Sequence, residues 1–441
     1  MAMLAGGATR VINCEIGDDL AGQLHRRICE RVRDDLEANL LYLSDGETQL
    51  LLASLDLLGV GGTLLVELRR QIEAATGIPA RSVVITCTHT HDGPVLNALL
   101  HDAPTNESYE AKLQGWLVEA AKEAVASARP ARLGWGKGVA RVGYSRRMCW
   151  ADGVHTMYNP RGRESPQPLF TGLEGPDDPS HAVLFAVDAR DKCIALIHNN
   201  TCHATCMESA TFASADFPGE ARALLRSALG ADLPVLYLQG ASGDISPWDL
   251  SKPRPADGER RAREMGAVLA GETFELIHRA QPTETPVLGH VFEDVEMGVR
   301  LPTPEALARA REIAALGEEK AGRGSYVLAV NGVLALWDQF RDRPFDTLPV
   351  HAIRIGDCAL VTNPCELYCQ FGLDTKRRSP AAVTVVVQLA DGSSGYCPTI
   401  PAIMGGGYSG EAIRWARLEP YAGYKLVEAS CRLLRQVWDQ G

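Results

Sequence analysis

The chain has 441 residues, of which 46% are hydrophobic and 22% charged, so it can bury a large core and has the composition of an ordinary globular protein. Its net charge is −11, and its longest basic run is the triplet Lys376–Arg378. Both features argue against a nucleic-acid partner or an anionic membrane surface, and a small-molecule substrate is expected instead.

The start of the chain carries neither the basic region nor the apolar core of a secretory signal, so a cytoplasmic location is expected. In that compartment the twelve cysteines are expected to be reduced thiols that pack as small hydrophobes. The pairs Cys202/Cys206 and Cys365/Cys369 leave a Cys₄ zinc site open as an alternative. No stable membrane insertion is expected, because the longest charge-free stretch is a glycine-rich loop. The sequence leaves the formation of a homo-oligomer open.

Apolar residues recur at helical spacing in several stretches. In the first, Leu20, Leu24 and Ile28 predict a helix over Asp19–Arg33. Gly77 is a typical residue for ending the second. The remaining helices are expected at Val66–Thr76, Tyr109–Ala128, Arg260–Ile277 and Tyr424–Val437, with further helix starts at Phe217 and Thr303.

Strands alternate with these helices. The turn pair Asp45-Gly46 predicts a hairpin of Leu40–Ser44 and Gln49–Leu55. Further strands are expected at Val83–Ile85, a pair around Leu133–Val142, Val183–Asp188 with Cys193–His198, Val235–Leu238, His351–Ile355 with Ala359–Thr362, and Val383–Leu389. The alternation predicts an α/β fold with a mixed β-sheet core flanked by helices.

The stretch Ser82–Pro94 organises the rest of the chain. Its apolar strand runs into T-H-T-H-D-G-P, and extended geometry would place His89 and His91 on one face at the carboxyl end of the strand. Open α/β sheets carry their chemistry there, and two imidazoles suit a zinc site with an open position. The alternative is a pair of histidines that cap neighbouring groups. Asp56, after an earlier apolar run, is expected to be a helix N-cap or to orient a histidine.

Three other residues follow strand ends. His203 comes after the strand ending at His198, Glu366 after the strand ending at Thr362, and Tyr396 after Val383–Leu389. Two histidines, a glutamate and water complete a catalytic zinc site, and a tyrosine can be a further ligand or can polarise a carbonyl. The separations are too large for a short zinc signature.

Two arginines lie beside an apolar stretch, at Arg146 and Arg147. Arginine in such a context can anchor a carboxylate or a carbonyl. The alternative is a surface salt bridge, which would contribute little.

An ordered set of motifs resembles the neutral/alkaline, non-lysosomal ceramidase family of zinc amidases, from about Gln49 to the last helix. T-H-T-H-D-G-P is similar to that family's T-H-T-H-S-G-P, with Asp92 in place of serine, and S-R-R is similar to its arginine motif. The motifs that follow in order are G-P-D-D-P, the loop of His203, S-A-D-F-P-G, Q-G-A-S-G-D-I-S-P, N-P-C-E-L, and G-Y-C-P-T with Tyr408.

The resemblance implies a role for each residue of a site. His89, His203, Glu366 and Tyr396 would bind Zn²⁺, and Tyr396 would also act in catalysis. His91, Arg146 and Tyr408 would contact the scissile amide or the charged groups of the reaction. A zinc-activated water would attack the carbonyl, and His91 would carry a proton to the leaving amine.

The chain departs from the family pattern in two ways. We expect a single hydrolase domain over residues 10–441, without the C-terminal immunoglobulin-like domain of secreted ceramidases. Its N-terminal text, I-G-D-D-L-A-G-Q-L-H, lacks the family's D-I-T-G-P. The expected function is therefore zinc-dependent hydrolysis of an amide or lactam, with a small soluble substrate favoured over a lipid. An ester or lactone hydrolase, a ceramidase proper, and a zinc-binding protein without catalysis stay open.

Overall fold

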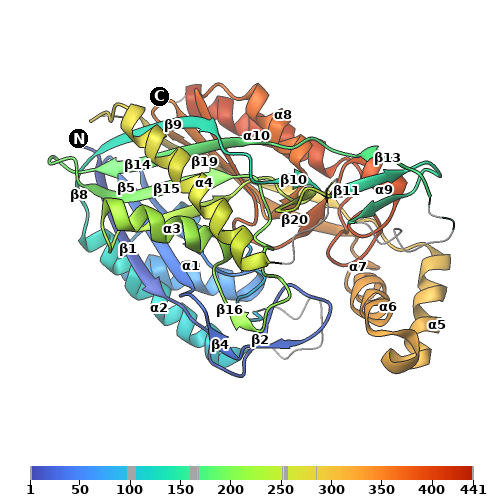
Figure 1. The fold of residues 1–441 in the computed structure, drawn as a ribbon. Coiled ribbons are helices and arrows are strands. Elements are labelled where there is room, and N and C mark those ends of the chain that lie inside the picture. The colour runs from blue at the N-terminus through green and yellow to red at the C-terminus, as the bar shows by residue number, and fades with distance from the viewer. Residues whose placement is uncertain are drawn as a thin grey trace.

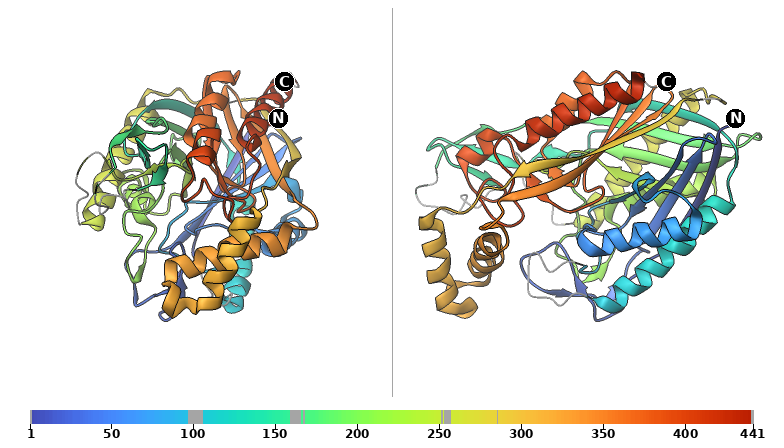
Figure 2. Two further views of the ribbon diagram at one scale, coloured as in Figure 1. Left: turned by 90° about the vertical axis from the view of Figure 1, so that its right-hand side faces the viewer. Right: turned by 180° about the vertical axis from the view of Figure 1, so that it is seen from behind.

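The computed structural model describes residues 2–96, 106–158, 168–250, 257–284 and 286–439, together with residues 166 and 252. Three larger sheets pack against one another in this described part, and helices cover their outer faces (Figures 1 and 2). Each of the three sheets contains both parallel and antiparallel strand pairs. The expected α/β fold with mixed sheets and flanking helices is confirmed.

The first sheet delivers the two neighbouring histidines. Its strand order is β7 (Val83–Cys87), β6 (Gln49–Leu55), β5 (Glu37–Ser44), β1 (Leu4–Val11) and β8 (Arg129–Pro130). The hairpin of β5 and β6 forms as predicted. Helix α1 (Gly62–Thr76) ends at the left-handed Gly77 and, through the short 3₁₀ turn η1 (Ala80–Ser82), connects β6 to the parallel β7. Helix α2 (Glu107–Ala126) lies beside α1.

The second sheet precedes His203. Its order is β17 (Val235–Gln239), β15 (Cys193–Asn200), β14 (Ser180–Val187) and β9 (Arg132–Val139). The predicted strand pair around Leu133–Val142 is wrong, because this segment is the one strand β9 and its partner is β14. Helices α3 (Asp216–Leu229) and α4 (Gly258–Arg279) pack on each other and on this sheet.

The third sheet precedes Glu366 and Tyr396. Its order is β19 (Leu288–Gly298), β20 (Phe345–Ile355), β21 (Cys358–Thr362) and β23 (Val383–Val387), and helices α8 (Cys369–Arg378) and α10 (Ala422–Asp439) cover it. Smaller sheets of two or three strands complete the fold. They are β12 (His155–Met157) with β11 (Arg147–Trp150) and β13 (Phe170–Leu173), β10 (Tyr144–Ser145) with β18 (Ile245–Ser246), β22 (Cys365–Leu367) with β24 (Gly395–Cys397), and β16 (Phe212–Ala213) with β4 (Arg31–Val32).

The three large sheets share one core. Leu41 and Leu52 of the first sheet, Leu184 and Ile197 of the second, and Leu360 of the third belong to a single cluster of buried side chains. Because the inner faces meet in this cluster, the ends of β7, β15 and β21 are held in a fixed relation to one another. This arrangement brings residues that are far apart in sequence to one region.

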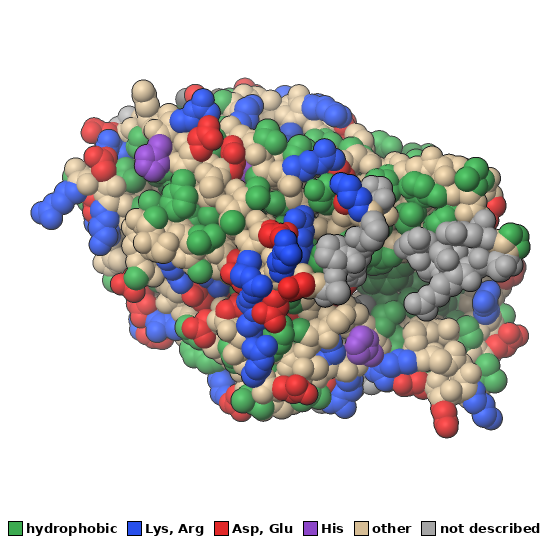
Figure 3. All heavy atoms as spheres, in the orientation of Figure 1, with side chains coloured by type: hydrophobic (Ala, Val, Ile, Leu, Met, Phe, Trp, Pro, Cys, Tyr) green, Lys and Arg blue, Asp and Glu red, His purple; other side chains and the backbone are tan. Residues whose placement is uncertain are grey.

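A helical arm projects from the body (Figures 1 and 2). It consists of α5 (Pro304–Ala321), α6 (Arg323–Val327), a π-helical stretch η3 (Leu328–Leu334) and α7 (Ala335–Phe340). Thr303 caps α5 through a hydrogen bond from the Ala306 backbone N–H, as the Thr-Pro-Glu start predicts. The molecular surface is hollowed between this arm and the body (Figure 3). Among the described helices, none is both long and apolar enough to cross a bilayer.

The predicted helix over Asp19–Arg33 is wrong. The segment is irregular and contains the short strands β2 (Asp19–Leu20), β3 (Arg27–Ile28) and β4. The four-residue spacing did not mark one buried stripe, since Leu20 is fully buried whereas Ile28 is 40% exposed. Gly22 also adopts a φ of 93°, which an α-helix does not accommodate.

Asp56 has neither of the expected roles. Its carboxylate accepts a hydrogen bond from the Glu37 backbone N–H at 2.9 Å and pairs with Arg222 at 2.8 Å. Asp56 is buried, and these contacts only partly offset the cost of burying its charge, because burial still raises its pKa to about 6. It is therefore a structural link between the first sheet and α3.

Acidification is expected to destabilise the fold through His181, a buried residue of β14 whose Nε2 lies 2.8 Å from the Thr273 hydroxyl. Burial, together with the charge of Lys376, lowers the pKa of His181 to about 4. The unfolded chain takes up this proton below about 6.5, so the stabilisation is complete above that pH and is lost as the pH falls towards 4.

The measurement is the free energy of unfolding in urea at about pH 7 and pH 5, where this one site contributes roughly 2 kcal/mol of the difference. His181→Gln cannot titrate and should lose that part of the pH dependence. Equal pH dependence in the wild type and the variant would contradict the assignment.

Candidate metal centre

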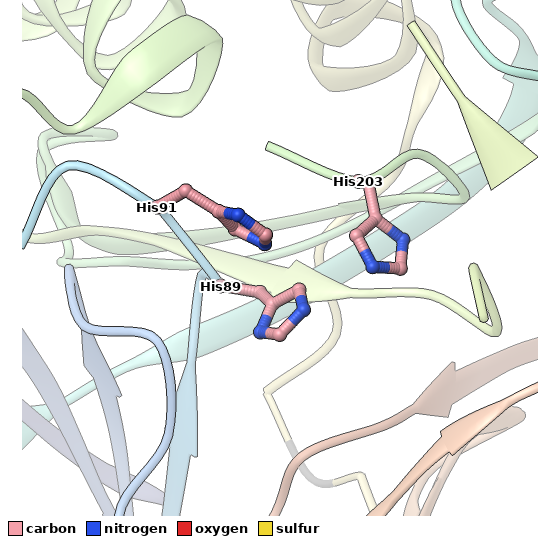
Figure 4. A group of neighbouring side chains, drawn as sticks. All are labelled: His89, His91 and His203. Carbon is pink, nitrogen blue, oxygen red and sulfur yellow. The ribbon is translucent and has the colours of Figure 1, made fainter. Parts of the chain in front are cut away.

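Three histidines from two sheets converge at one point. His89 and His91 follow β7, and His203 follows β15, and the side chains approach one another from different segments (Figure 4). One ring nitrogen of each lies within 4.8 Å of the others, which makes a group able to hold a metal ion. The ring centroids of His89 and His203 are 4.7 Å apart.

The local reason for this convergence differs from the prediction. Strand β7 ends at Cys87, and His89 has a φ of 64°, so the two-residue period of an extended strand does not reach His91. A left-handed conformation is unfavourable for histidine by roughly 1 kcal/mol or more. It is held by a hydrogen bond from the His89 backbone N–H to the Leu57 carbonyl at 3.0 Å. The turn, rather than the strand pleat, directs both rings to the site.

Backbone carbonyls fix the tautomers of two histidines. His89 Nδ1 lies 2.7 Å from the Leu58 carbonyl oxygen, and His203 Nδ1 lies 2.6 Å from the Ser242 carbonyl oxygen. A carbonyl oxygen can only accept, so each Nδ1 carries the proton in the neutral ring and each Nε2 presents a lone pair. Ser242 is itself held by a hydrogen bond from its N–H to the Gln388 side chain.

A carboxylate faces the two lone pairs. Glu366 Oε2 lies 3.4 Å from His89 Nε2 and 3.2 Å from His203 Nε2, and the glutamate side chain is only 12% exposed. Three atoms that offer lone pairs would repel one another at these distances without a positive charge, which Arg146 Nη2 supplies to His203 Nε2 at 3.0 Å and a bound cation would supply to all three. Two imidazole nitrogens and a carboxylate oxygen are the donor types that zinc takes in catalytic sites, so the residues present fit a metal cation.

The electrostatics favour the metal-binding protonation states. Burial and then the charge of Arg146 lower the pKa of His203 to about 3. Burial also lowers the pKa of His91 well below its usual value. Burial opposes ionisation of Glu366, but its close contacts with the His203 and His89 rings outweigh burial and hold its pKa well below the usual range. Neutral imidazoles and an ionised carboxylate are the forms that bind a metal ion.

His91 differs from the other two histidines. Both of its ring nitrogens are buried, and neither has a hydrogen-bond partner in the described structure. Its ring packs edge-on against His89 at 5.1 Å and lies 6.1 Å from the ring of His203. A buried imidazole with both nitrogens unpartnered is unusual and is available to a substrate or a metal ion.

Arg146 points into the same site, so the surface salt-bridge alternative is wrong. It is buried, and its Nη2 lies 3.0 Å from His203 Nε2 while donating to the Gly243 carbonyl at 2.8 Å and to the Tyr396 hydroxyl at 3.2 Å. Its Nη1 donates to the Tyr158 hydroxyl at 3.0 Å. Its Nε is buried without a partner in the described structure.

Arg147 is buried too, but it supports the site from outside. It pairs with Glu174 at 2.9 Å and donates to the backbone carbonyls of Ala402, Gly406 and Tyr408. The loop that carries Tyr408 is therefore fastened to β11.

The two predicted tyrosines lie at this site. Strands β22 and β24 pair in parallel with Glu366 opposite Tyr396, so the phenol emerges beside the carboxylate. The rings of Tyr396 and Tyr408 are 5.6 Å apart. Burial raises the pKa of both phenols, so they stay protonated at neutral pH and can donate hydrogen bonds.

Several supporting groups were missed from the sequence. They are Tyr158 and the backbone carbonyls of Leu58, Ser242 and Gly243, all of which contact a predicted site residue. The small-residue loop Gln239–Pro247 was the available signal for two of them, because it follows a strand end as the predicted residues do. No pattern singled out Tyr158 or Leu58.

The cysteine alternative finds no support among the described residues. All twelve cysteines are free. Cys202 and Cys206 lie in the cluster of Phe217 and Met265, whereas Cys365 lies in a different cluster with Phe371. Within the described ranges, the group of possible metal ligands whose atoms all lie within 4.8 Å of one another consists of the three histidines and includes no cysteine.

Solved ceramidase structures share this fold. One is the neutral ceramidase from Pseudomonas aeruginosa, with a TM-score of 0.77 at 17% identity over 100% of this chain and 75% of that one. Another is a ceramidase complexed with C2, with a TM-score of 0.77 at 17% identity over 100% of this chain and 76% of that one. Neither the family models nor the curated sequences that were searched gave a match. The likeness to neutral ceramidase predicted from the motifs is confirmed at the level of the fold.

The donor set predicts about one tightly bound zinc ion per chain. His203→Ala should lose most of the metal, because it removes a fully buried nitrogen whose tautomer is already fixed for binding. Metal content after dialysis checks this, with His181→Gln, a buried histidine of β14 outside the cluster, as the matched control. A His203→Ala protein that keeps a full zinc ion would remove His203 from the ligand set.

Proposed function

We propose that this chain is a zinc-dependent amidohydrolase that acts on carbon-nitrogen bonds other than peptide bonds, as a single domain over residues 10–441. The observation that carries the proposal is the arrangement of His89, His203 and Glu366, with two lone pairs fixed towards one carboxylate oxygen. The shared fold with neutral ceramidase supports hydrolysis of an amide.

The proposed metal ligands are His89, His203, Glu366 and Tyr396. When bound, zinc would supply a Lewis acid and lower the pKa of a water molecule to about 7. Tyr396 lies opposite Glu366 on the paired strand. Its hydroxyl accepts a hydrogen bond from Arg146 Nη2, which also contacts His203 Nε2.

Arg146 is proposed to hold the scissile amide. Its guanidinium is fixed in place by Gly243 and Tyr158, so it can direct N–H groups at a carbonyl oxygen without rearrangement. Tyr408 adds a phenol beside Tyr396, on a loop that Arg147 anchors. Donors that are ordered before the reaction stabilise developing negative charge most effectively.

His91 is proposed to move the proton. Its ring nitrogens have no partner in the described structure, so one of them can take a proton and deliver it to the leaving nitrogen. Neither His89 nor His203 can do this while its Nδ1 is hydrogen bonded to a carbonyl and its Nε2 faces the metal position.

The proposed substrate is an N-acyl amide or a lactam, with a small soluble compound favoured. Turnover should be measured with a panel of short-chain N-acyl amines, lactams and ceramides of increasing acyl length, with and without a chelator. Hydrolysis of a short-chain amide that stops on chelation supports the proposal. Turnover of ceramides alone would correct the substrate class, and no turnover of any amide would leave a zinc-binding protein.

Arg146→Ala is expected to keep zinc and lose activity, because the guanidinium is placed to bind substrate. Arg146→Lys should rescue poorly, since an ammonium cannot reproduce the planar set of donors that reaches Tyr158 and Gly243 together. Metal content and kcat of the two variants check this. Wild-type turnover in Arg146→Ala would show that the arginine only supports the fold.

Tyr396→Phe removes one oxygen and keeps the ring in its buried place on β24. It should preserve folding and lower kcat by roughly 10²–10³-fold, the loss typical of one oxyanion-stabilising donor. The matched control is Tyr424→Phe, an exposed residue at the start of α10. A kcat close to that of the wild type would leave Tyr396 as only a wall of the pocket.

A further inference from the structure

The irregular segment 19–33, called the N-terminal strap below, is threaded between the two loops that carry the histidines. The Ala21 N–H donates to the Gly93 carbonyl at 2.9 Å, and the Val95 N–H donates to the Asp19 carbonyl at 3.0 Å. On the other side, the Glu30 N–H donates to the Thr211 carbonyl at 2.7 Å. The strap therefore joins the loop after β7 to the loop after His203.

One side chain of the strap contacts both loops. The Arg27 side chain is 2% exposed, and its Nη1 lies 2.8 Å from Asp92 Oδ1 and 2.8 Å from the Ala210 carbonyl oxygen. Its Nη2 donates to the carbonyls of Ala21 and His91. The guanidinium thus uses both of its terminal nitrogens, and one of its contacts is the main chain of His91 itself.

The backbone of the strap also packs on the His91 ring. Gly22 has a φ of 93°, and a Cβ at this position would lie 2.4 Å from His91 Cγ. Only glycine fits here without moving the ring. The strap therefore contacts His91 at its carbonyl through Arg27 and at its imidazole through Gly22.

His91 needs such support more than its neighbours do. His89 and His203 are oriented by hydrogen bonds from Nδ1 to backbone carbonyls, whereas neither ring nitrogen of His91 has a partner in the described structure. The orientation of the His91 ring must then come from its main chain and from packing. Arg27 and Gly22 supply these two restraints.

We propose that Arg27 is a positioning residue that holds His91 in its working orientation, through the buried pair with Asp92 and the hydrogen bond to the His91 carbonyl. This inference rests on the proposed function of His91 as the group that moves the proton. Asp92 stands where the resembled motif has serine, and the strap stands where the family's opening text is missing. Asp92 and the strap are thus in direct contact, through Arg27.

The test compares variants that separate positioning from folding. Arg27→Met alone leaves the Asp92 carboxylate buried without its partner, which is strongly destabilising. The double variant Arg27→Met with Asp92→Ser removes both charges and keeps the interior neutral. Arg26→Met is the matched control, because Arg26 is the next residue and forms a half-exposed ion pair with Asp19.

The first readout is independent of activity. In protein labelled with ¹³C at histidine Cε1, the His91 resonance is identified by its loss in His91→Asn. This resonance should shift or broaden in the double variant and stay in place in Arg26→Met, while the His181 resonance stays in place in both. An unmoved His91 resonance in a folded double variant would overturn the inference, whether or not the chain turns over an amide.

The second readout is steady-state kinetics with the best substrate of the panel. The double variant should keep its zinc and its KM within about threefold and lose about 10²-fold in kcat, the cost of a misplaced catalytic group. Arg27→Lys should fall between the double variant and the wild type, since an ammonium can pair with Asp92 but reaches fewer carbonyls. A wild-type kcat in the double variant would make the pair purely structural. If the wild type were inactive and free of zinc, the proposed function would be overturned. The His91 resonance would then be the remaining test of the positioning role of Arg27.

Glycine substitutions give a second arm that changes no charge. Gly22→Ala should move the His91 resonance and lower kcat, because its Cβ would meet the ring. Gly17→Ala is matched in backbone strain, with a φ of 101°, but a Cβ there has nothing within 4 Å. If both substitutions had the same effect on His91, backbone strain near the N-terminus would explain the result and the packing restraint would be wrong.

Discussion

The site depends on the tautomers of two histidines. The carbonyls of Leu58 and Ser242 each accept a hydrogen bond from the Nδ1–H of one ring, and this leaves two Nε2 lone pairs directed at the same Glu366 oxygen. Such an arrangement is unfavourable unless positive charge lies close to it. Arg146 Nη2 supplies some beside His203, and a bound cation would supply more. The fold therefore holds the two imidazole nitrogens and the Glu366 carboxylate close together although they repel one another, as binding and catalytic sites commonly do. The shared core of the three sheets keeps these groups from moving apart.

Around this centre the side chains are held in two different ways. His89 and His203 are oriented by backbone carbonyls, whereas His91 and Arg146 keep nitrogens without a partner in the described structure. Arg147 and Arg27 neighbour the site without entering it, and each fastens a loop by donating to several carbonyls. Arginine suits both tasks, because its donors lie in a rigid fork and its charge is permanent.

The sequence predicted the regular part of the fold well and its irregular part poorly. The hairpin of β5 and β6, the unit that delivers His89 and the capped start of α5 follow from local signals, namely a turn pair, a terminal glycine and a Thr-Pro start. The helix over Asp19–Arg33 was wrong, because its apolar residues do not form one buried face and its backbone is hydrogen bonded to two separate loops. The conformation of that segment is set by contacts with residues far away in sequence, which no local pattern contains.

The candidate site shows the same division. His89, His203, Glu366 and Tyr396 could be named because each follows a predicted strand, yet the left-handed turn at His89 and the contacts of Tyr158 could not. These depend on side chains that meet only after the sheets have docked. The parallel partners β22 and β24 contribute Glu366 and Tyr396 late in the chain, whereas β7 contributes His89 near its beginning. Formation of the centre therefore requires contacts of very high sequence separation, which slow folding. A newly synthesised chain would expose the inner faces of the three sheets before the metal donors come together. Metal binding would therefore follow the completion of folding and would not initiate it.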